Sequence, residues 1–179
     1  MNKQPKEFYS LKVNNEYYTP EYAVTPLLEF LEPFRDKVIW CPFDKENSEF
    51  VLVLRKNGYK VTYSHVDYGY NFFSYEPDYF DLCISNPPFQ EKKQTFERLL
   101  SFDKPFAMLM TLTWLNDSAP KRLFRDKDLQ LLMFEERIKY HNAGVDKINF
   151  SSAYYCYNFL PKQIIMRSLK DNYRQVRLF

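Results

Sequence analysis

The stretch DLCISNPPF, residues 81–89, joins a short apolar run directly to two prolines and an aromatic side chain. Residues 81–85 predict a buried β-strand, because the run is apolar and too short for a helix. Neither Pro87 nor Pro88 has a backbone N–H to donate, and each forces the residue before it into an extended conformation. The predicted strand therefore ends in a stiff turn that presents carbonyl oxygens beside the side-chain amide of Asn86.

Helix-like and strand-like segments alternate on both sides of this stretch. The spacing of apolar residues predicts helices at 21–34, 45–58 and 91–102, and strands at 37–43, 59–65 and 105–115. This alternation favours an α/β fold with a mostly parallel sheet and helices on both of its faces. Such sheets bind ligands at the carboxyl ends of their strands, so the turn after residue 85 is an expected site.

The last third of the chain has a different pattern. A short basic helix is predicted at 120–125, and strands are predicted at 130–140 and 153–161. No convincing helix separates these two strands, so we expect an antiparallel hairpin at one edge of the sheet. Residues 163–170 either close the sheet or form a final helix.

Length and composition limit the classes of protein that fit. The 179 residues suffice for one domain, and no linker or repeat divides them, so we expect a single domain over 1–179. The net charge of +2 is too small to indicate a nucleic-acid partner by itself. Three cysteines without a CxxC pair favour reduced thiols in a cytoplasmic protein and give no sign of a metal site. No apolar segment is long enough to cross a bilayer, so no membrane association is expected.

The turn at 86–89 suggests a particular chemistry. The Asn86 side-chain oxygen and a backbone carbonyl form a rigid pair of acceptors, which suits a substrate with two donor hydrogens on one atom. The exocyclic NH₂ of a nucleobase is such a group, and two hydrogen bonds make its conjugated nitrogen more nucleophilic. Phe89 is placed to stack on the base. On the residues alone, a proline-rich turn that only caps a strand is the alternative.

The segment NPPF after a buried strand resembles motif IV of S-adenosylmethionine-dependent amino-methyltransferases, which methylate N6 of adenine or, less often, N4 of cytosine. The resemblance implies a Rossmann-like fold, S-adenosylmethionine as the cofactor and no metal. It also implies that the Asn86 side chain and the Pro87 carbonyl hold the amine of a base flipped from its duplex, with Phe89 stacked on that base. The resemblance thus implies a catalytic set of Asn86, Pro87, Pro88 and Phe89.

The segment EYYTPEYAV, residues 16–24, resembles motif X of the same family, which contacts the methionine end of the cofactor. The resemblance makes Tyr18, Thr19 and Pro20 candidate cofactor-binding residues. From the residues themselves, Thr19 is predicted to be the N-cap of the following helix and Pro20 its first residue. A well-capped helix without any ligand is the alternative.

The first predicted strand and its loop, VIWCPFDKENSEF, depart from the family pattern because the expected glycines are absent. Trp40, Pro42 and Phe43 match loosely and are expected to contact the cofactor, and Asp44 is expected to replace the missing acidic contact. Ser48 is predicted to cap the next helix. The segment resembles one in phage-type adenine methyltransferases, and a degenerate, inactive copy is the alternative.

The segment after the second strand resembles the part of the family that holds the adenosyl group. Ser64 and His65 are candidates for the ribose hydroxyls, although a single histidine at a strand end is more often structural. The run GYNFF resembles motif III, where an acid accepts a hydrogen bond from the cofactor's adenine amine. Asn71 takes the place of that acid, and Phe72 is expected to pack against the adenine ring.

The segment KINFSSAYYCYNFL resembles motif VIII and makes Phe150 the candidate aromatic that faces the flipped base opposite Phe89. A core phenylalanine before an edge strand is the alternative. Lys92 and Lys93 are expected to bind phosphates if they flank the NPPF turn. Lys121, Arg122 and Arg125 form a second basic group.

The motif order X, I, IV and VIII resembles the gamma arrangement of adenine methyltransferases. We therefore expect one methyltransferase catalytic domain over 1–179 that acts on adenine N6 in DNA. No separate target-recognition domain fits, so we expect recognition to be weak or supplied by a partner protein. Enzymes that act on RNA adenines share the motif. A non-catalytic module that binds nucleic acid or protein is the hypothesis from another class.

Overall fold

A mixed seven-stranded sheet forms the centre of the computed structural model, which describes residues 18–140 and 150–170. The strands are β1 (Val38–Cys41), β2 (Lys60–Tyr63), β3 (Leu82–Ser85), β4 (Phe106–Thr111), β5 (Gln130–Phe134), β6 (Ser152–Tyr157) and β7 (Ile164–Arg167). Their order across the sheet is β2-β1-β3-β4-β6-β5-β7. The predicted α/β fold with a mostly parallel sheet is confirmed.

The first four strands and the last three pair differently. Strands β2, β1, β3 and β4 are parallel, whereas β6 is antiparallel to both β4 and β5. The predicted antiparallel pairing of the two late strands is confirmed. Strand β7 pairs parallel to β5 and forms the outer edge, which decides between the two alternatives for residues 163–170.

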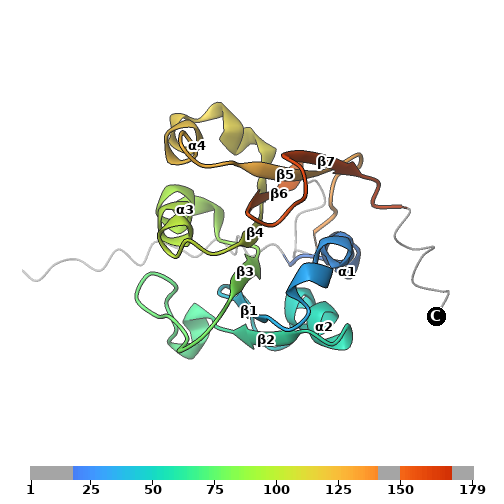
Figure 1. Cartoon of the computed structure of the whole chain (residues 1–179), viewed down its shortest axis with the longest axis vertical. Coiled ribbons are helices and arrows are strands. Elements are labelled where there is room, and N and C mark those ends of the chain that lie inside the picture. The colour runs from blue at the N-terminus through green and yellow to red at the C-terminus, as the bar shows by residue number, and fades with distance from the viewer. Residues whose placement is uncertain (1–17, 141–149, 171–179) are drawn as a thin grey trace, which may run out of the picture.

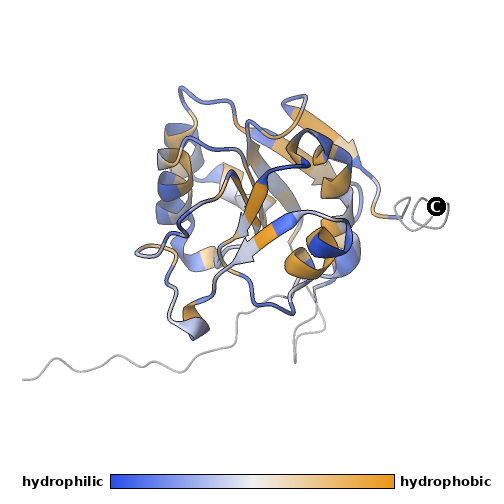
Figure 2. Ribbon diagram, turned by 60° about the horizontal axis from the view of Figure 1, so that its bottom comes forward, coloured by the Kyte–Doolittle hydropathy of each residue, from blue (hydrophilic) through white to orange (hydrophobic). Residues whose placement is uncertain are grey.

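Helices cover both faces of the sheet. They are α1 (Glu21–Val24), α2 (Glu49–Lys56), α3 (Lys92–Ser101) and α4 (Ser118–Leu123). Figure 1 shows α1 and α2 on one side of the sheet and α3 and α4 on the other. Side chains from each helical pair join a separate apolar cluster, which accounts for the two layers of core. In Figure 2 the connecting loops are mostly hydrophilic, as expected for solvent-exposed connections.

The predicted continuous helix at 21–34 is wrong. Only α1 is α-helical there, and two 3₁₀ segments follow at Thr25–Phe30 and Glu32–Phe34. Each of these segments has a proline in its first positions. Proline lacks the N–H that an α-helix interior requires, and its ring clashes with the preceding turn, so the helix is broken into short pieces.

Helix α2 begins four residues later than the predicted helix at 45–58, and the cap signals in its sequence mark both of its ends. The Ser48 hydroxyl accepts a hydrogen bond from Val51 N at 3.4 Å, which confirms it as the N-cap. Gly58 follows the helix with φ of +82°, a left-handed conformation that glycine adopts without steric cost. These two signals place α2 directly after the loop that leaves β1.

The fold gathers several loops at one edge of the sheet. Because β1 to β4 are parallel, their carboxyl ends lie at the same edge of the sheet, and the loops that follow them all begin there. Backbone hydrogen bonds join two of these loops, from Ser64 N to Cys41 O and from Asp44 N to Ser64 O, both at 3.1 Å. None of the helices within residues 18–140 and 150–170 has the length and apolar character needed to span a membrane.

Candidate functional site

A cavity of about 570 Å³ opens at the carboxyl ends of β1, β2 and β3. Its volume falls within the usual range for small-molecule sites. Four segments line it, namely the residues before α1, the loop after β1 with the start of α2, the loop after β2, and the turn after β3. The lining residues are Tyr18, Thr19, Pro42, Phe43, Asp44, Lys45, Asn47, Ser48, Glu49, Phe50, His65, Val66, Tyr70, Asn71, Phe72, Phe73, Asn86, Pro87, Pro88, Phe89 and Glu91.

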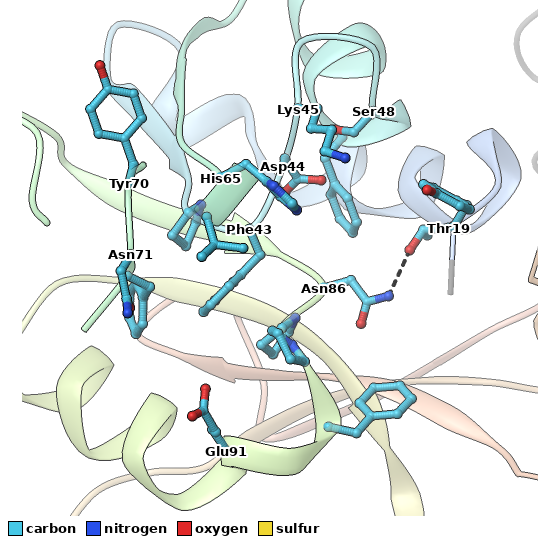
Figure 3. A pocket seen from close by; sticks show the side chains of 18 of the residues that line it. Thr19, Phe43, Asp44, Lys45, Ser48, His65, Tyr70, Asn71, Asn86 and Glu91 are labelled. Atoms are coloured by element: carbon cyan, nitrogen blue, oxygen red, sulfur yellow. Dashed lines mark hydrogen bonds between the residues drawn. The ribbon is translucent and has the colours of Figure 1, made fainter. Parts of the chain in front are cut away.

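The whole NPPF turn lines this cavity, and a distant segment orients its amide. Asn86 Nδ2 donates a hydrogen bond to Thr19 Oγ1 at 3.2 Å, across 67 positions of sequence. Figure 3 shows this bond, with the amide oxygen of Asn86 directed away from Thr19. The donor side of the amide is thus held by Thr19, and its acceptor side points away from this contact.

Thr19 is not the N-cap that the sequence predicts. Pro20 occupies the cap position, and no side chain accepts a capping hydrogen bond there. The threonine hydroxyl is instead directed at Asn86, so its role lies in the cavity. Tyr18 also lines the cavity and is half-exposed, whereas Pro20 is buried outside the lining.

Asp44 connects the loop after β1 to the strand that ends in the NPPF turn. Its carboxylate accepts hydrogen bonds from the hydroxyls of Ser85, the last residue of β3, and Ser48, the cap of α2. The side chain is buried, and desolvation raises its pKa to about 6 even though both hydroxyls favour the charged form. Asp44 therefore ties together three elements around the cavity.

The absence of glycine from the loop after β1 causes no backbone strain. Within the described residues, positive φ in a residue with a side chain occurs only at Asp103 and Asn158. Residues 42–48 turn without the left-handed conformation that favours glycine. Phe43 in this loop lines the cavity, and its ring centroid lies 4.7 Å from that of Phe72.

The rings of Phe43, Phe72 and Phe73 contact one another and form what we call the aromatic end of the cavity. The ring of Phe72 is nearly buried and lies 5.4 Å from that of Phe73. Within the loop after β2, Asn71 Oδ1 accepts a hydrogen bond from Phe73 N at 2.9 Å, while the Asn71 carbonyl accepts one from Tyr75 N at 2.7 Å. The Asn71 side chain therefore stabilises its own turn, in addition to lining the cavity.

Trp40 and Ser64, two predicted cofactor-binding residues, do not line the cavity. Both are completely buried. The Trp40 indole N–H donates to Ser64 Oγ at 3.0 Å, and that hydroxyl is 3.4 Å from the Pro42 carbonyl. Alternate residues of a strand point to opposite faces of the sheet, and the Trp40 side chain enters the aromatic core instead of the strand's end. The two residues support the loops from beneath.

His65 lines the cavity, and its Nδ1 has a local partner. This nitrogen accepts a hydrogen bond from Asp67 N at 3.1 Å and caps a short 3₁₀ segment. Asp67 in turn forms an ion pair with Lys45 at 2.7 Å, which joins the loops after β2 and β1. Lys45 is a lining residue that its sequence position alone did not single out.

Phe150 lies beside Phe89, but not across a gap from it. The two ring centroids are 5.6 Å apart and the rings are nearly perpendicular, at 88°. Stacking gaps of about 3.5–4.0 Å on both sides of a base would need about 7–8 Å between parallel rings. The predicted sandwich of a base between the two rings is therefore not formed, and Phe150 lies outside the cavity lining.

Lys92 and Lys93 begin α3, directly after the short 3₁₀ segment Phe89–Glu91 that follows the turn. Neither lines the main cavity. Lys93 forms a surface ion pair with Glu97 at 3.3 Å and shares a smaller groove with Arg122 of α4. The two predicted basic groups thus meet on the surface between α3 and α4.

Several lining residues were not predicted from the sequence, including Glu49, Phe73 and Glu91. Glu49 and Glu91 were assigned only to the starts of helices, where acids are common for electrostatic reasons. Each lies in or directly after the loop that follows a parallel strand, which was the available signal. Within the residues that the structure describes, no group of three or more histidine, cysteine or acidic side chains is arranged to hold a metal ion.

Comparison with known proteins identifies the fold. No protein-family model matches the sequence, and no curated protein is detectably similar to it. The modification subunit of a candidate type I restriction enzyme from Vibrio vulnificus YJ016 superimposes with a TM-score of 0.56 at 12% identity, over 79% of this chain and 44% of that one. This chain thus spans less than half of the Vibrio protein.

A second solved structure agrees with the first. A protein from Listeria monocytogenes, described as a candidate class I S-adenosylmethionine-dependent methyltransferase, superimposes with a TM-score of 0.51 at 14% identity, over 92% of this chain and 69% of that one. At such identities the similarity establishes the fold alone. The chain has the Rossmann-like α/β fold of class I methyltransferases.

Proposed function

We propose that this protein transfers a methyl group from S-adenosylmethionine to the N6 amine of adenine in DNA. The observation that carries the proposal is the position of the NPPF turn. It lies at the carboxyl end of β3, against a cavity in a methyltransferase fold, with the Asn86 amide held by Thr19. A turn that only capped a strand would need neither the cavity nor the second contact.

The residues around the cavity fit the cofactor. Its polar end carries Thr19, Asp44 and Ser48, which offer hydrogen-bonding groups to the amino-acid part of the molecule. Its aromatic end carries Phe43 and Phe73, which suit a flat purine ring. When bound, the cofactor supplies an electrophilic methyl group. This fit supports an intact cofactor site over the degenerate copy, despite the missing glycines.

In our proposal the turn prepares the amine for attack. Asn86 Oδ1 and the Pro87 carbonyl accept the two N–H hydrogens, which favours a pyramidal nitrogen with an available lone pair. Pro88 has no N–H that could compete for the Pro87 carbonyl. The new nitrogen–carbon bond forms as the sulfur–carbon bond breaks, and the methylated amine then releases its extra proton to water. No strong general base is required.

We assign the target base to the cavity side of Phe89. Phe150 contacts this ring edge-on and lies outside the lining, so it supports Phe89 and does not form the second wall of a sandwich. An adenine inside a duplex cannot reach the turn, so the base is flipped out. Lys92 and Lys93 follow the turn and are proposed to contact the phosphates beside it.

Target recognition is proposed to come from a partner protein. In our proposal, the segments that line the cavity bind the cofactor and the target amine. The proposed contacts to the duplex are those of lysines with DNA phosphates, and phosphate contacts carry no sequence information. The Vibrio neighbour is itself described as a subunit of a larger enzyme, which supports a similar arrangement here. We expect the protein to act in the cytoplasm, where chromosomal or phage DNA is accessible.

The first experiment measures cofactor binding and methyl transfer separately. We expect S-adenosylmethionine and its demethylated product to bind with micromolar affinity by calorimetry. We then expect transfer of a labelled methyl group to DNA, with N6-methyladenine identified by mass spectrometry after digestion. RNA of matched sequence is the competing substrate. Binding of the cofactor without transfer to either nucleic acid would favour the non-catalytic module, and transfer to RNA alone would redirect the substrate assignment.

The Asn86→Ala variant tests the mechanism itself. Loss of one of two positioned acceptors is expected to lower turnover at least 100-fold, because these hydrogen bonds form in a pre-organised site. Cofactor affinity should change less than threefold. Asn116→Ala removes an exposed amide that does not line the cavity and is the matched control. Turnover in Asn86→Ala close to that of the control would rule out the proposed role of the turn.

A further inference from the structure

The aromatic end of the cavity contains two polar side chains that can accept a hydrogen bond from a purine. Asn71 and Glu91 both line this cavity, next to Phe43. A purine stacked among the aromatic rings would place its edge groups within reach of such side chains. The acceptor that reads the exocyclic amine determines whether the cavity prefers adenine over other purines.

Asn71 is the position where the sequence predicts this acceptor, but its oxygen serves the backbone. Oδ1 accepts from Phe73 N at 2.9 Å and closes a turn that the Asn71 carbonyl also stabilises, through Ser74 N and Tyr75 N. Such a local turn directs the amide oxygen toward its own chain. The loop keeps its shape through this bond, so the oxygen cannot rotate toward a ligand without opening the turn.

Glu91 offers a stronger acceptor on the opposite side of the same end. It closes the 3₁₀ segment Phe89–Glu91 and precedes α3, and its side chain forms no capping hydrogen bond with that helix. Figure 3 shows its carboxylate directed into the cavity, toward the side formed by Asn71 and Phe43. An ionised carboxylate only accepts hydrogen bonds, and such charge-assisted bonds are stronger than those of an amide.

We infer that Glu91 accepts the hydrogen bond of the cofactor's adenine amine, in the role that the sequence assigned to Asn71. The inference rests on the proposed function, because it takes S-adenosylmethionine to be the ligand of this cavity. A 6-oxo purine presents an acceptor at the same position, so the carboxylate repels it. Glu91 therefore makes the cavity selective for adenosyl over inosyl ligands.

This assignment gives one short segment two tasks. Asn86 and Glu91 are five residues apart, at the two ends of the turn that follows β3. Asn86 holds the amine of the substrate base, and Glu91 holds the amine of the cofactor's base. The segment 86–91 would thus bind both adenines, and a change in its backbone would affect both ligands together.

The test measures binding alone, with the neutral product S-adenosylhomocysteine and its inosyl analogue as probes. Calorimetry with wild-type protein should show at least about tenfold preference for the adenosyl ligand. In Glu91→Ala the affinity for the adenosyl ligand should fall about tenfold, while the inosyl ligand binds as before or better. The preference should thus approach one. Glu97→Ala removes the same charge from α3, the helix that follows Glu91, outside the cavity lining, and should keep the wild-type preference.

The outcomes separate this inference from the proposed function. If wild-type protein binds neither ligand, the cofactor assignment fails and the role of Glu91 fails with it. If wild-type protein binds the adenosyl ligand and Glu91→Ala keeps the same preference, only the role of Glu91 is overturned. Glu91→Gln keeps the side-chain shape and replaces the alanine variant if that variant does not fold. Its preference for the adenosyl ligand is expected to lie between those of the wild type and Glu91→Ala.

Discussion

The carboxyl group of Asp44 is buried in the loop after β1 and has two hydroxyl partners. Burial favours the neutral acid and raises the pKa to about 6, whereas Ser85 and Ser48 favour the carboxylate. At this position the sequence predicted a cofactor contact, and the structure adds a structural role. The same side chain lines the cavity and joins the loop after β1 to the residue that precedes Asn86.

This pKa has a consequence for stability. The folded-state pKa of about 6 lies above the ordinary value of 3.8, so the folded protein binds more protons than the unfolded chain between these values. The contribution of Asp44 to stability is therefore fully present below pH 3.8 and is lost as the pH rises through 6. The difference between the two pKa values corresponds to about 3 kcal/mol.

Urea unfolding between pH 4 and pH 7.5 checks this expectation. The free energy of unfolding of the wild type, minus that of Asp44→Asn, should fall by about 2–3 kcal/mol across this range. The asparagine cannot titrate, so the comparison isolates the one carboxyl group. Asp126→Asn removes an exposed carboxylate and is the matched control. A difference that stays constant with pH would contradict the raised pKa of Asp44.

At the scale of elements, the turn after β3 is held by a segment that precedes α1. The hydrogen bond from Asn86 to Thr19 joins two parts of the chain that are 67 positions apart in the sequence. Strand β3 delivers the turn to the edge of the sheet, but the strand does not determine the rotation of the Asn86 side chain. Thr19, which precedes the N-cap position of α1, supplies that orientation through its hydroxyl.

Thr19→Val tests this orientation, because valine keeps the shape and removes the hydroxyl. With saturating cofactor, turnover should fall about three- to tenfold, the effect of one neutral hydrogen bond. The side-chain NH₂ signals of Asn86 in ¹⁵N NMR, identified by their loss in Asn86→Ala, should shift in Thr19→Val. Thr19→Ser restores the hydroxyl and should restore both measurements. Unshifted signals in Thr19→Val would show that the threonine does not position the amide.

At the scale of the whole molecule, long-range contacts join the two ends of the described chain. The Tyr154 hydroxyl of β6 donates to the carbonyl of Ala23 in α1 at 2.8 Å, and both residues are fully buried. Arg167 of β7 forms an ion pair with Glu29, which follows α1. These contacts hold the segment before the cavity against the last strands of the sheet, so the position of Thr19 depends on the complete sheet.

Tyr154→Phe should therefore lower stability more than its small size change suggests. Loss of the hydroxyl leaves the Ala23 carbonyl buried without this donor, which costs about 1–3 kcal/mol. For a chain of this length, each kcal/mol lowers Tm by about 2–4 °C. Tyr157→Phe removes a hydroxyl that bonds Asp103 at the surface and should change Tm little. Equal melting of the two variants in calorimetry would contradict the buried contact.

The sequence by itself determined the order of helices and strands and the nature of the central turn. Apolar periodicity, the serine cap of α2, Gly58 and the two consecutive prolines are local signals, and local signals decide where elements begin and end. They also predicted the mostly parallel sheet and the edge at which the cavity opens. The same signals failed at 21–34, where the prolines broke the expected helix.

Only the tertiary structure decided which polar groups meet at that edge. It joined Asn86 to Thr19, turned Trp40 and Ser64 away from the cavity, and directed Glu91 into it. These outcomes depend on strand order, register and side-chain rotation across long stretches of chain. Periodicity carries no information on such distant pairs, because it reports the environment of a residue and not the identity of its partners.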